Sequence, residues 1–324
     1  MLTLPAMATD NGGEPMAFLK LGAGARATGM GGAYTAVADD AAGILYNPAG
    51  FIKVRGLQFI AETYILSFGR SINYISTCKP FPVGNSLFAA GISWLNYSAG
   101  QDIEARSTNS TDPESTISDS THIFIFSGAA RISRKFSFGG NVRVYLETLD
   151  GTKGLGAGFD LGAMLNIMEG LNAGFSVLNM STTLDWDNTV YKESLPQTYN
   201  LGVSYFVPSV FSINKLDVLA SADGVYNSFG FFKFRPGVEI TANDLFFFRA
   251  GYNGAISLGM GFRFSPSPVF SAKFDYAFSN DQILDGSFNH RIGLTVEYMT
   301  QGTGGEAGGA AEKSQEGKKN EEAW

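Results

Sequence analysis

The residues that could carry acid–base, nucleophilic or metal chemistry are few in this 324-residue sequence. There are two histidines, His122 and His290, and neither has a serine or cysteine partner at the spacing of a catalytic triad. The lone cysteine, Cys78, excludes an intrachain disulfide and a thiolate metal cluster. The sequence therefore predicts no enzyme activity, no metal site and no cofactor.

A glycine-rich block, residues 18–51, is the next candidate for chemistry, because the backbone N–H groups of such loops can cradle a phosphate. Gly22 and Gly24 are followed by Gly29 at the wrong interval for a dinucleotide-binding fingerprint, and no Gly-Lys-Ser/Thr sequence follows. No predicted strand precedes the block. Its small residues instead suit a backbone that packs closely against other elements.

The composition excludes several classes of protein. The net charge of −7 argues against a nucleic-acid partner, since such proteins are usually basic. Only 16% of the residues are charged, against about a quarter in typical soluble domains, whereas 40 are glycine and 27 are phenylalanine. No stretch approaches the ~18 apolar residues that a transmembrane helix needs. A membrane position therefore requires a closed β-barrel, the other fold that satisfies its backbone in lipid.

Residues 58–299 alternate apolar residues with small or polar ones, which is the period-2 pattern of β-strands. The pattern predicts an all-β transmembrane protein, a 14-stranded antiparallel outer-membrane β-barrel, and an even strand number is typical of such barrels. The predicted strands are residues 58–66, 68–78, 86–97, 121–133, 136–148, 155–167, 170–180, 197–207, 215–227, 231–242, 246–253, 256–265, 269–279 and 289–299.

The predicted connections alternate in length. Those after even-numbered strands include the tight turns, whereas the three long polar segments, residues 98–120, 181–196 and 280–288, follow odd-numbered strands. Outer-membrane barrels have short periplasmic turns and longer external loops. We therefore expect a bacterial outer-membrane protein in contact with lipid, with both termini on the periplasmic side.

Charged residues in the predicted strands share one face, opposite a face of apolar and aromatic residues. The alternative is a half-buried soluble sheet, but fourteen strands carry more apolar surface than one soluble core of this length would bury. An Arg or Lys that faces lipid at mid-depth costs about 2–4 kcal/mol, so we expect the charged face to line the lumen. With eight acids and six bases on this face, we predict a salt-bridge lattice across the lumen, formed by Glu62, Arg143, Glu147, Asp160, Asp217, Asp223, Arg235, Glu239, Arg249, Arg263, Lys273, Asp275, Arg291 and Glu297.

Three further units lie outside the predicted barrel. Residues 1–8 end in Ala6-Met7-Ala8, a small-x-small pattern, and are interpreted as the remnant of a signal peptide, with an ordinary flexible terminus as the alternative. Residues 9–57 form an N-terminal unit that contains the glycine-rich block. Residues 300–324 are rich in Gly, Lys and Glu, which predicts a disordered, charged periplasmic tail after the barrel of residues 58–299.

The glycine-rich block resembles the N-terminal region of the PorV/PorQ family, outer-membrane barrels of the FadL-like superfamily. The resemblance extends over roughly residues 18–299, and its matching elements are residues 24–27, 29–33, 38–40, 46–50, 195–196, 259–264 and 289–294. The resemblance implies that residues 9–57 fold into the lumen as a plug, or hatch. The residues of this plug motif are Gly24, Arg26, Gly29, Gly31, Gly32, Asp39, Asp40, Asn47, Pro48, Ala49 and Gly50.

The charged residues of the plug motif suggest how it is held. We expect Arg26 to pair with a lumenal carboxylate such as Glu62 or Glu147. Asp39 and Asp40 either meet lumenal arginines or cap a helix that starts just after them. Structural packing is the expected role of the motif, in preference to direct contact with a ligand.

Two functions remain open. The resemblance to PorV implies a protein-interaction or shuttle component of a type IX-like secretion route, whose partners would be exported cargo proteins and a secretion channel. The relation to FadL implies passive transport of a hydrophobic small molecule, such as a fatty acid. A purely structural barrel is a third alternative. A conduit for an apolar solute needs an apolar slot, so the charged lumen favours the secretion role.

Overall fold

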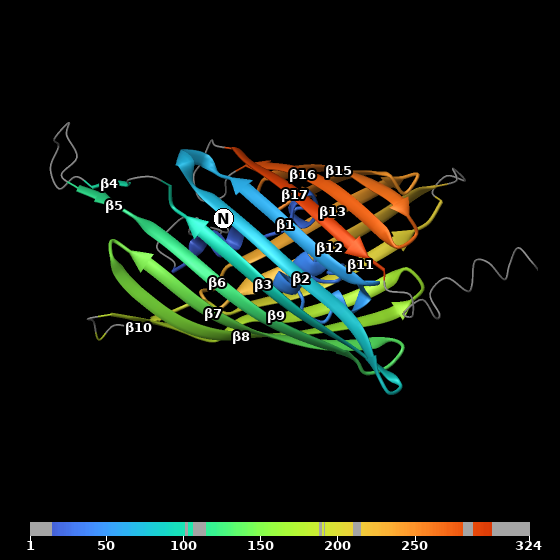
Figure 1. The fold of residues 1–324 in the computed structure, drawn as a ribbon, viewed down its shortest axis with the longest axis horizontal. Coiled ribbons are helices and arrows are strands. Elements are labelled where there is room, and N and C mark those ends of the chain that lie inside the picture. The colour runs from blue at the N-terminus through green and yellow to red at the C-terminus, as the bar shows by residue number, and fades with distance from the viewer. Residues whose placement is uncertain are drawn as a thin grey trace, which may run out of the picture.

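The computed structural model describes residues 15–100, 103–105, 115–187, 190, 192–209, 215–280 and 288–299, and Figure 1 shows them as a β-barrel around a short helical segment. The predicted signal-peptide remnant (1–8), the first residues of the N-terminal unit and the predicted tail (300–324) lie outside the described residues.

Fourteen antiparallel strands form the closed barrel, in which each strand pairs with its neighbours in the chain and β17 pairs with β1. The strands are β1 (Leu57–Ile65), β2 (Ser71–Val83), β3 (Ser86–Ser98), β6 (Asp119–Arg131), β7 (Phe136–Leu149), β8 (Thr152–Met168), β9 (Leu171–Trp186), β11 (Thr198–Val207), β12 (Leu216–Asn227), β13 (Phe232–Ala242), β14 (Phe246–Tyr252), β15 (Ile256–Ser267), β16 (Phe270–Asn280) and β17 (Phe288–Tyr298). The predicted 14-stranded fold is thus confirmed. Among the described residues, no helix has the length and apolar character to span a bilayer.

Three short strands lie outside the closed sheet. β4 (Ile103–Ala105) and β5 (Ser115–Ile117) form a separate hairpin, and β10 (Lys192–Ser194) pairs with the end of β9. The sequence pattern ended β9 at residue 180, but the strand continues to Trp186. Asn179 and Ser181 have positive φ angles and form an irregularity in the strand, and their residue types are typical of a turn. Pairing with β8 resumes beyond this irregularity.

The two faces of the strands follow the predicted alternation. In β14, Phe247 and Arg249 are buried, whereas Phe246 and Phe248 are 45% and 54% exposed on the outer face. Of the charged residues predicted to face the lumen, the following are buried: Glu62, Arg143, Asp160, Asp223, Glu239, Arg249, Asp275 and Arg291. The outer face carries large exposed apolar residues on strands all around the barrel.

The two ends of the barrel differ in their connections. At one end, called here the tight-turn end, β2–β3, β6–β7, β8–β9, β13–β14 and β15–β16 are joined by two to four residues. The long connections of residues 99–118, 187–197 and 281–287 all lie at the opposite, long-loop end. The barrel begins with β1 and finishes with β17 at the tight-turn end, because Leu57 pairs with Tyr298.

Residues 15–56, called here the N-terminal segment, lie inside the barrel (Figure 1, dark blue). The segment contains three 3₁₀ turns and one helical turn: η1 (Ala17–Leu21), α1 (Ala25–Gly29), η2 (Ala41–Leu45) and η3 (Phe51–Lys53). α1 packs on β14 to β17, whereas η2 and η3 pack on the opposite part of the wall, β1 to β3 and β6. The segment therefore crosses the lumen, from Pro15 near the long-loop end to β1 at the tight-turn end.

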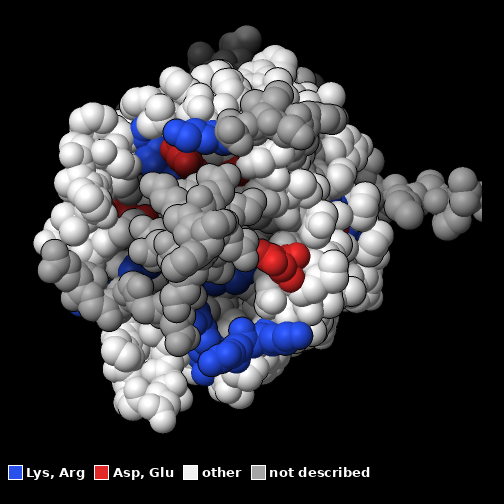
Figure 2. All heavy atoms as spheres, turned by 90° about the vertical axis from the view of Figure 1, so that its right-hand side faces the viewer, with Lys and Arg blue, Asp and Glu red and all other residues white. Residues whose placement is uncertain are grey.

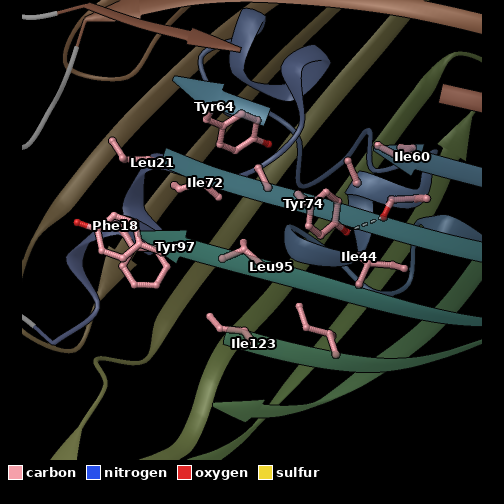
Figure 3. Close-up of a cluster of buried hydrophobic side chains, with 14 of the residues drawn as sticks. Phe18, Leu21, Ile44, Ile60, Tyr64, Ile72, Tyr74, Leu95, Tyr97 and Ile123 are labelled. Atoms are coloured by element: carbon pink, nitrogen blue, oxygen red, sulfur yellow. Dashed lines mark hydrogen bonds between the residues drawn. The ribbon is translucent and has the colours of Figure 1, made fainter. Parts of the chain in front are cut away.

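An apolar cluster fills one side of the lumen, between the N-terminal segment and the wall of β1, β2, β3, β6 and β7 (Figure 3). Phe18 of η1 stacks on Tyr97 of β3 with ring centroids 4.2 Å apart. Ile44 of η2 and Phe51 of η3 are fully buried in the same cluster. These strands place Tyr, Ile and Leu on their inner face, so this side of the lumen is largely apolar.

Candidate functional site

The N-terminal segment touches the wall so closely that glycines are needed at the contacts. Gly31 has a φ of +65°, and a Cβ on it would lie 2.4 Å from the backbone nitrogen of Tyr252 in β14. A Cβ on Gly29 would lie 3.0 Å from the Cα of Gly259 in β15. The wall contributes glycines in turn, since a Cβ on Gly139 of β7 would lie 2.2 Å from the carbonyl oxygen of Pro48.

Buried charged residues of the wall bind backbone groups of the N-terminal segment. Glu62 of β1 accepts a hydrogen bond of 3.0 Å from the N–H of Ala25. Asp223 of β12 accepts two, each of 2.9 Å, from the N–H groups of Tyr34 and Thr35. Arg291 of β17 donates to the carbonyl oxygen of Leu21 at 2.6 Å. A segment of short turns leaves many backbone groups without helical partners, and these side chains satisfy them away from water.

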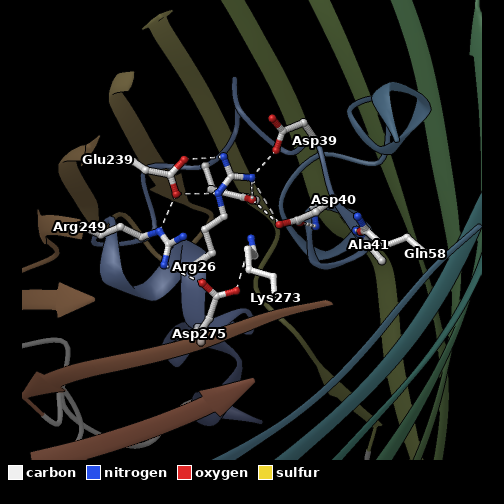
Figure 4. Close-up of polar contacts among 12 residues, drawn as sticks. Arg26, Asp39, Asp40, Ala41, Gln58, Glu239, Arg249, Lys273 and Asp275 are labelled. Atoms are coloured by element: carbon white, nitrogen blue, oxygen red, sulfur yellow. Dashed lines mark hydrogen bonds and ion pairs between the residues drawn. The ribbon is translucent and has the colours of Figure 1, made fainter. Parts of the chain in front are cut away.

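Arg26 of α1 is the centre of an ion-pair cluster (Figure 4). Its guanidinium forms a two-pronged contact with Glu239 of β13, with Nε–Oε2 and Nη2–Oε1 distances of 2.9 and 2.8 Å. Its Nη1 lies 2.5 Å from Asp39 and 3.5 Å from Asp40, within the N-terminal segment itself. The expected pairing of Arg26 with Glu62 or Glu147 is therefore wrong, since α1 directs this side chain toward the opposite part of the wall.

The cluster continues along the wall rather than across the lumen. Arg249 of β14 lies 2.5 Å from Glu239 and 2.8 Å from Asp275 of β16, and Lys273 lies 3.3 Å from Asp275. The predicted lattice across the lumen is not formed by these pairs. The N-terminal segment occupies the space between the walls, so wall charges pair with near neighbours or with Arg26. We call Arg26, Asp39, Asp40, Glu239, Arg249, Lys273 and Asp275 the Arg26 cluster.

The other residues of the plug motif hold turns of the segment. Asp40 caps η2, because its Oδ1 accepts a 3.0 Å hydrogen bond from the N–H of Gly43, and its Oδ2 accepts one of 2.6 Å from the hydroxyl of Tyr34. Asn47 donates from Nδ2 to the carbonyl oxygens of Thr35 and of Ala163 in β8, at 2.8 and 3.0 Å. Among the described residues, Asp39 and Asp40 pair with Arg26 of the segment and not with an arginine of the wall.

Four more residues of the segment make close contacts within it or with the wall. The carbonyl oxygen of Ala49 accepts a 3.1 Å hydrogen bond from the hydroxyl of Ser137 in β7. A Cβ on Gly50 would lie 2.3 Å from the carbonyl oxygen of Ala38. Gly32 lies against Arg235 of β13 and has a φ of +74°. The N–H of Gly24, the N-cap of α1, donates to the hydroxyl of Tyr64 in β1.

A second buried ion pair joins neighbouring strands on the other side of the lumen. Arg143 of β7 donates from Nε to Asp160 of β8 at 2.6 Å. Asp160 also accepts from Asn141 at 2.7 Å and from the backbone N–H of Asn179 at 2.9 Å, so it holds the irregularity of β9 in place.

Other residues of the predicted lattice make hydrogen bonds or ring contacts. Arg235 donates from Nε to Asn253 at 2.9 Å, and Arg263 lies 4.9 Å from the centre of the Phe247 ring. Asp217 accepts a 2.9 Å hydrogen bond from the N–H of Ser209 near the tight-turn end. Glu147 and Glu297 are half-buried near opposite ends of the barrel.

A cavity of about 150 Å³ lies at the long-loop end of the lumen, beneath η1. Its apolar lining comes from Phe18 and Leu21 of the N-terminal segment and from Ile72, Leu95, Leu195 and Val225 of the wall. Five cations also line it, Lys20, Arg143, Lys233, Arg235 and Arg291, together with several Asn, Ser and Thr side chains, whereas Asp and Glu are missing from its described lining. Nη2 of Arg143 and Nε of Arg291 are buried without a hydrogen-bond partner among the described residues. Tyr46, whose pKa burial raises to about 12, lines the cavity as a neutral phenol.

Comparison with solved structures places this architecture among known barrels. The toluene transporter TbuX of Ralstonia pickettii matches with a TM-score of 0.58 and 16% identity over 87% of this chain and 100% of that chain. A FadL homologue of Pseudomonas aeruginosa matches with 0.54 and 13%, over 84% of this chain and 97% of that chain. The toluene transporter TodX of Pseudomonas putida matches with 0.53 and 13%, over 86% and 97%.

The fold is that of the FadL-like outer-membrane barrels. At this level of identity the comparison concerns the fold. No protein-family model matches the sequence, and no curated protein is similar to it in sequence. The PorV/PorQ resemblance therefore remains a prediction from the motifs, and none of these structures supports a secretion role.

Sequence reasoning missed the apolar lining of the cavity and a group of cations at the tight-turn end. Tyr64, Tyr97 and Tyr145 are also buried in the lumen. For Tyr64 and Tyr145, the period-2 parity with Glu62 and Arg143 in the same strands is the signal that could have placed them there. Among the described residues, no three His, Cys, Asp or Glu side chains are grouped to hold a metal ion.

Proposed function

We propose that this chain is a passive outer-membrane channel for hydrophobic small molecules and that its N-terminal segment is the plug. The observation that carries the proposal is the apolar cavity at the long-loop end, which the N-terminal segment separates from the tight-turn end. The long loops face the outside of the cell, so the cavity receives a solute from the external medium. Both the cavity and the plug lie in a barrel of the same fold as structures described as toluene transporters and a FadL homologue.

The outer face supports a position in lipid. Leu201, Phe248 and Phe274 are 64%, 54% and 55% exposed, each on a face that alternates with buried polar residues. A soluble protein rarely exposes a contiguous apolar surface of this extent. Neighbouring barrels of this fold are channels or transporters, which also supports a function without catalysis.

The cavity favours an apolar molecule with one acidic group. A cavity of about 150 Å³ with an apolar part to its lining is large enough for a benzene-sized body. The unpartnered guanidinium nitrogens of Arg143 and Arg291 supply donors for a carboxylate, because a buried cation is stabilised by an anionic partner. We therefore expect a medium-chain carboxylate to bind more tightly than a neutral hydrocarbon of similar size.

Ligand binding to the purified protein in a nonionic detergent tests this proposal, with octanoate and toluene as the probes. Val225→Phe places a larger ring in the cavity and is expected to weaken octanoate binding at least tenfold. The matched control is Val203→Phe, at a position that is 46% exposed on the outer face. Saturable binding of octanoate that Val225→Phe leaves unchanged, or no binding of either probe, would contradict the proposed site.

The protein-interaction role in secretion gains no support from the structure or from its neighbours. That role needs a surface for a partner, whereas the cavity and the Arg26 cluster lie within the lumen. Co-purification of a giant barrel protein from native outer membranes would favour the secretion role over the proposed channel.

A further inference from the structure

A second cavity, of about 240 Å³, opens at the tight-turn end of the lumen. It lies between η3 of the N-terminal segment and the wall formed by β6, β7, β8 and β9. Its position is opposite to the apolar cavity, and none of the residues lining one cavity also lines the other. The proposed uptake function therefore leaves this second cavity without a role.

Four cations line the second cavity. Lys53 comes from η3, Arg131 is the last residue of β6, and Arg134 and Lys135 are in the turn between β6 and β7. The described lining contains neither Asp nor Glu. Figure 2 shows Lys and Arg side chains at several points of this end of the molecule. We call these four residues the basic cluster.

No ion pair joins the basic cluster to a carboxylate among the described residues, unlike the arginines of the Arg26 cluster. Lys53 is half-buried, and burial lowers the pKa of its ammonium group, with the positive charge of Arg131 acting in the same direction and Asp39 opposing it. Cations from three elements lie close together here and repel one another, so the arrangement costs electrostatic energy. A bound anion would remove this repulsion.

The rest of the lining adds neutral groups that can bind an anion. The Oγ of Ser133 accepts hydrogen bonds from the N–H groups of Lys135 and Phe136, which leaves its hydroxyl hydrogen available to donate. Asn172 accepts from Asn166 through its Oδ1 at 3.2 Å, so its amide nitrogen is available as a donor.

We propose that the basic cluster binds a phosphate group at the tight-turn mouth of the lumen. Four cations exceed what one carboxylate needs, since a single arginine fork already matches a carboxylate. A phosphate carries about two negative charges and oxygens in several directions, which suits cations that approach from separate elements. The bound group joins η3 to the β6–β7 turn and thereby fixes this end of the N-terminal segment. This inference is independent of the solute that the channel carries.

Isothermal titration of the full-length protein in a nonionic detergent tests the proposal, with inorganic phosphate as the first probe. Saturable binding is expected, and Lys53→Met should weaken it at least tenfold. The double variant Arg134→Gln with Lys135→Gln, whose side chains are exposed, should weaken it similarly without affecting folding. The matched control is Lys79→Gln on β2, an exposed cation outside the cavity, which should change the Kd by less than twofold.

Two further probes identify the source of the phosphate group. Dihexanoyl phosphatidic acid, a lipid phosphomonoester, that binds the wild type and loses affinity in the same variants would assign the site to a lipid headgroup if inorganic phosphate binds more weakly. The reverse order of affinity would assign it to a free phosphate. Acetate that binds as tightly as either phosphate probe would overturn the proposal. So would the absence of saturable phosphate binding, or equal Kd values in the wild type and both cluster variants.

Discussion

Replacing Arg26 with methionine removes the cation through which the N-terminal segment is held to the wall. Methionine keeps much of the aliphatic volume but removes the described ion-pair partner of Asp39 and Asp40 and leaves Glu239 paired with Arg249 alone. Removing one partner of a buried ion pair typically costs about 3–5 kcal/mol, because the remaining charge is left in a poor solvent. Asp39, whose side chain is 38% exposed, contributes less of this cost than Glu239, at 6%.

Hydrogen exchange of the backbone amides in the N-terminal segment measures this loss of local stability. Since about 1.4 kcal/mol corresponds to tenfold in an equilibrium constant, the amides of α1 should lose about 100-fold to several thousand-fold of their protection in Arg26→Met. Arg26→Lys keeps the charge but loses the two-pronged contact with Glu239, so it should fall between the wild type and Arg26→Met. Exchange from the barrel strands should change little.

The matched control breaks an ion pair that water surrounds. Lys192 and Asp185 lie 3.0 Å apart with side chains 69% and 60% exposed, and exposed pairs contribute about 0–1 kcal/mol. Lys192→Met should therefore leave the protection of α1 unchanged. If Arg26→Met alters that protection by less than threefold in a folded barrel, the Arg26 cluster does not hold the segment and the reasoning above fails.

Three further predictions concern the segment and the outer wall. Gly31→Ala should release the segment from β14, because it adds an overpacking cost of about 1–3 kcal/mol to the strain of a positive φ. The control is Gly254→Ala, which has the strain of a positive φ but no atom within 4 Å of the added Cβ. Equal hydrogen exchange of the N-terminal segment in the two variants would argue against close packing at Gly31. Phe248→Arg should weaken folding into liposomes by about 2–4 kcal/mol in urea titrations, whereas Val190→Arg, at a 94% exposed loop position, should not; equal titrations would argue against a lipid-facing Phe248. Deletion of residues 9–50 should leave a folded barrel with higher conductance in planar bilayers, and unchanged conductance would contradict the plug.

The barrel follows from local sequence pattern because a strand has a period of two. Alternation alone distinguishes the face of Phe248 from that of Arg249, and the cost of charge in lipid then decides which face points inward. The same reasoning located all fourteen strands. It ended β9 too early, because residues 179–181 have the composition of a turn, whereas pairing with β8 and β10 continues the strand beyond its irregularity.

The interior could not be derived in this way. Arg26 lies more than 200 residues from Glu239 in sequence, and its choice of Glu239 over Glu62 depends on the direction in which α1 enters the lumen. Likewise, Lys53 and the β6–β7 turn are separated by some 80 residues and meet only when the barrel closes around the N-terminal segment.

The strand number, the inward face and the lengths of the connections can be derived from residue order, because each depends on neighbours within one strand or turn. The pairing of buried charges, the apolar part of the lumen and the cluster of cations without carboxylates depend on how the chain folds in three dimensions. Barrel closure brings distant strands and the N-terminal segment together, and ion pairing and desolvation depend on distances of a few ångströms between them.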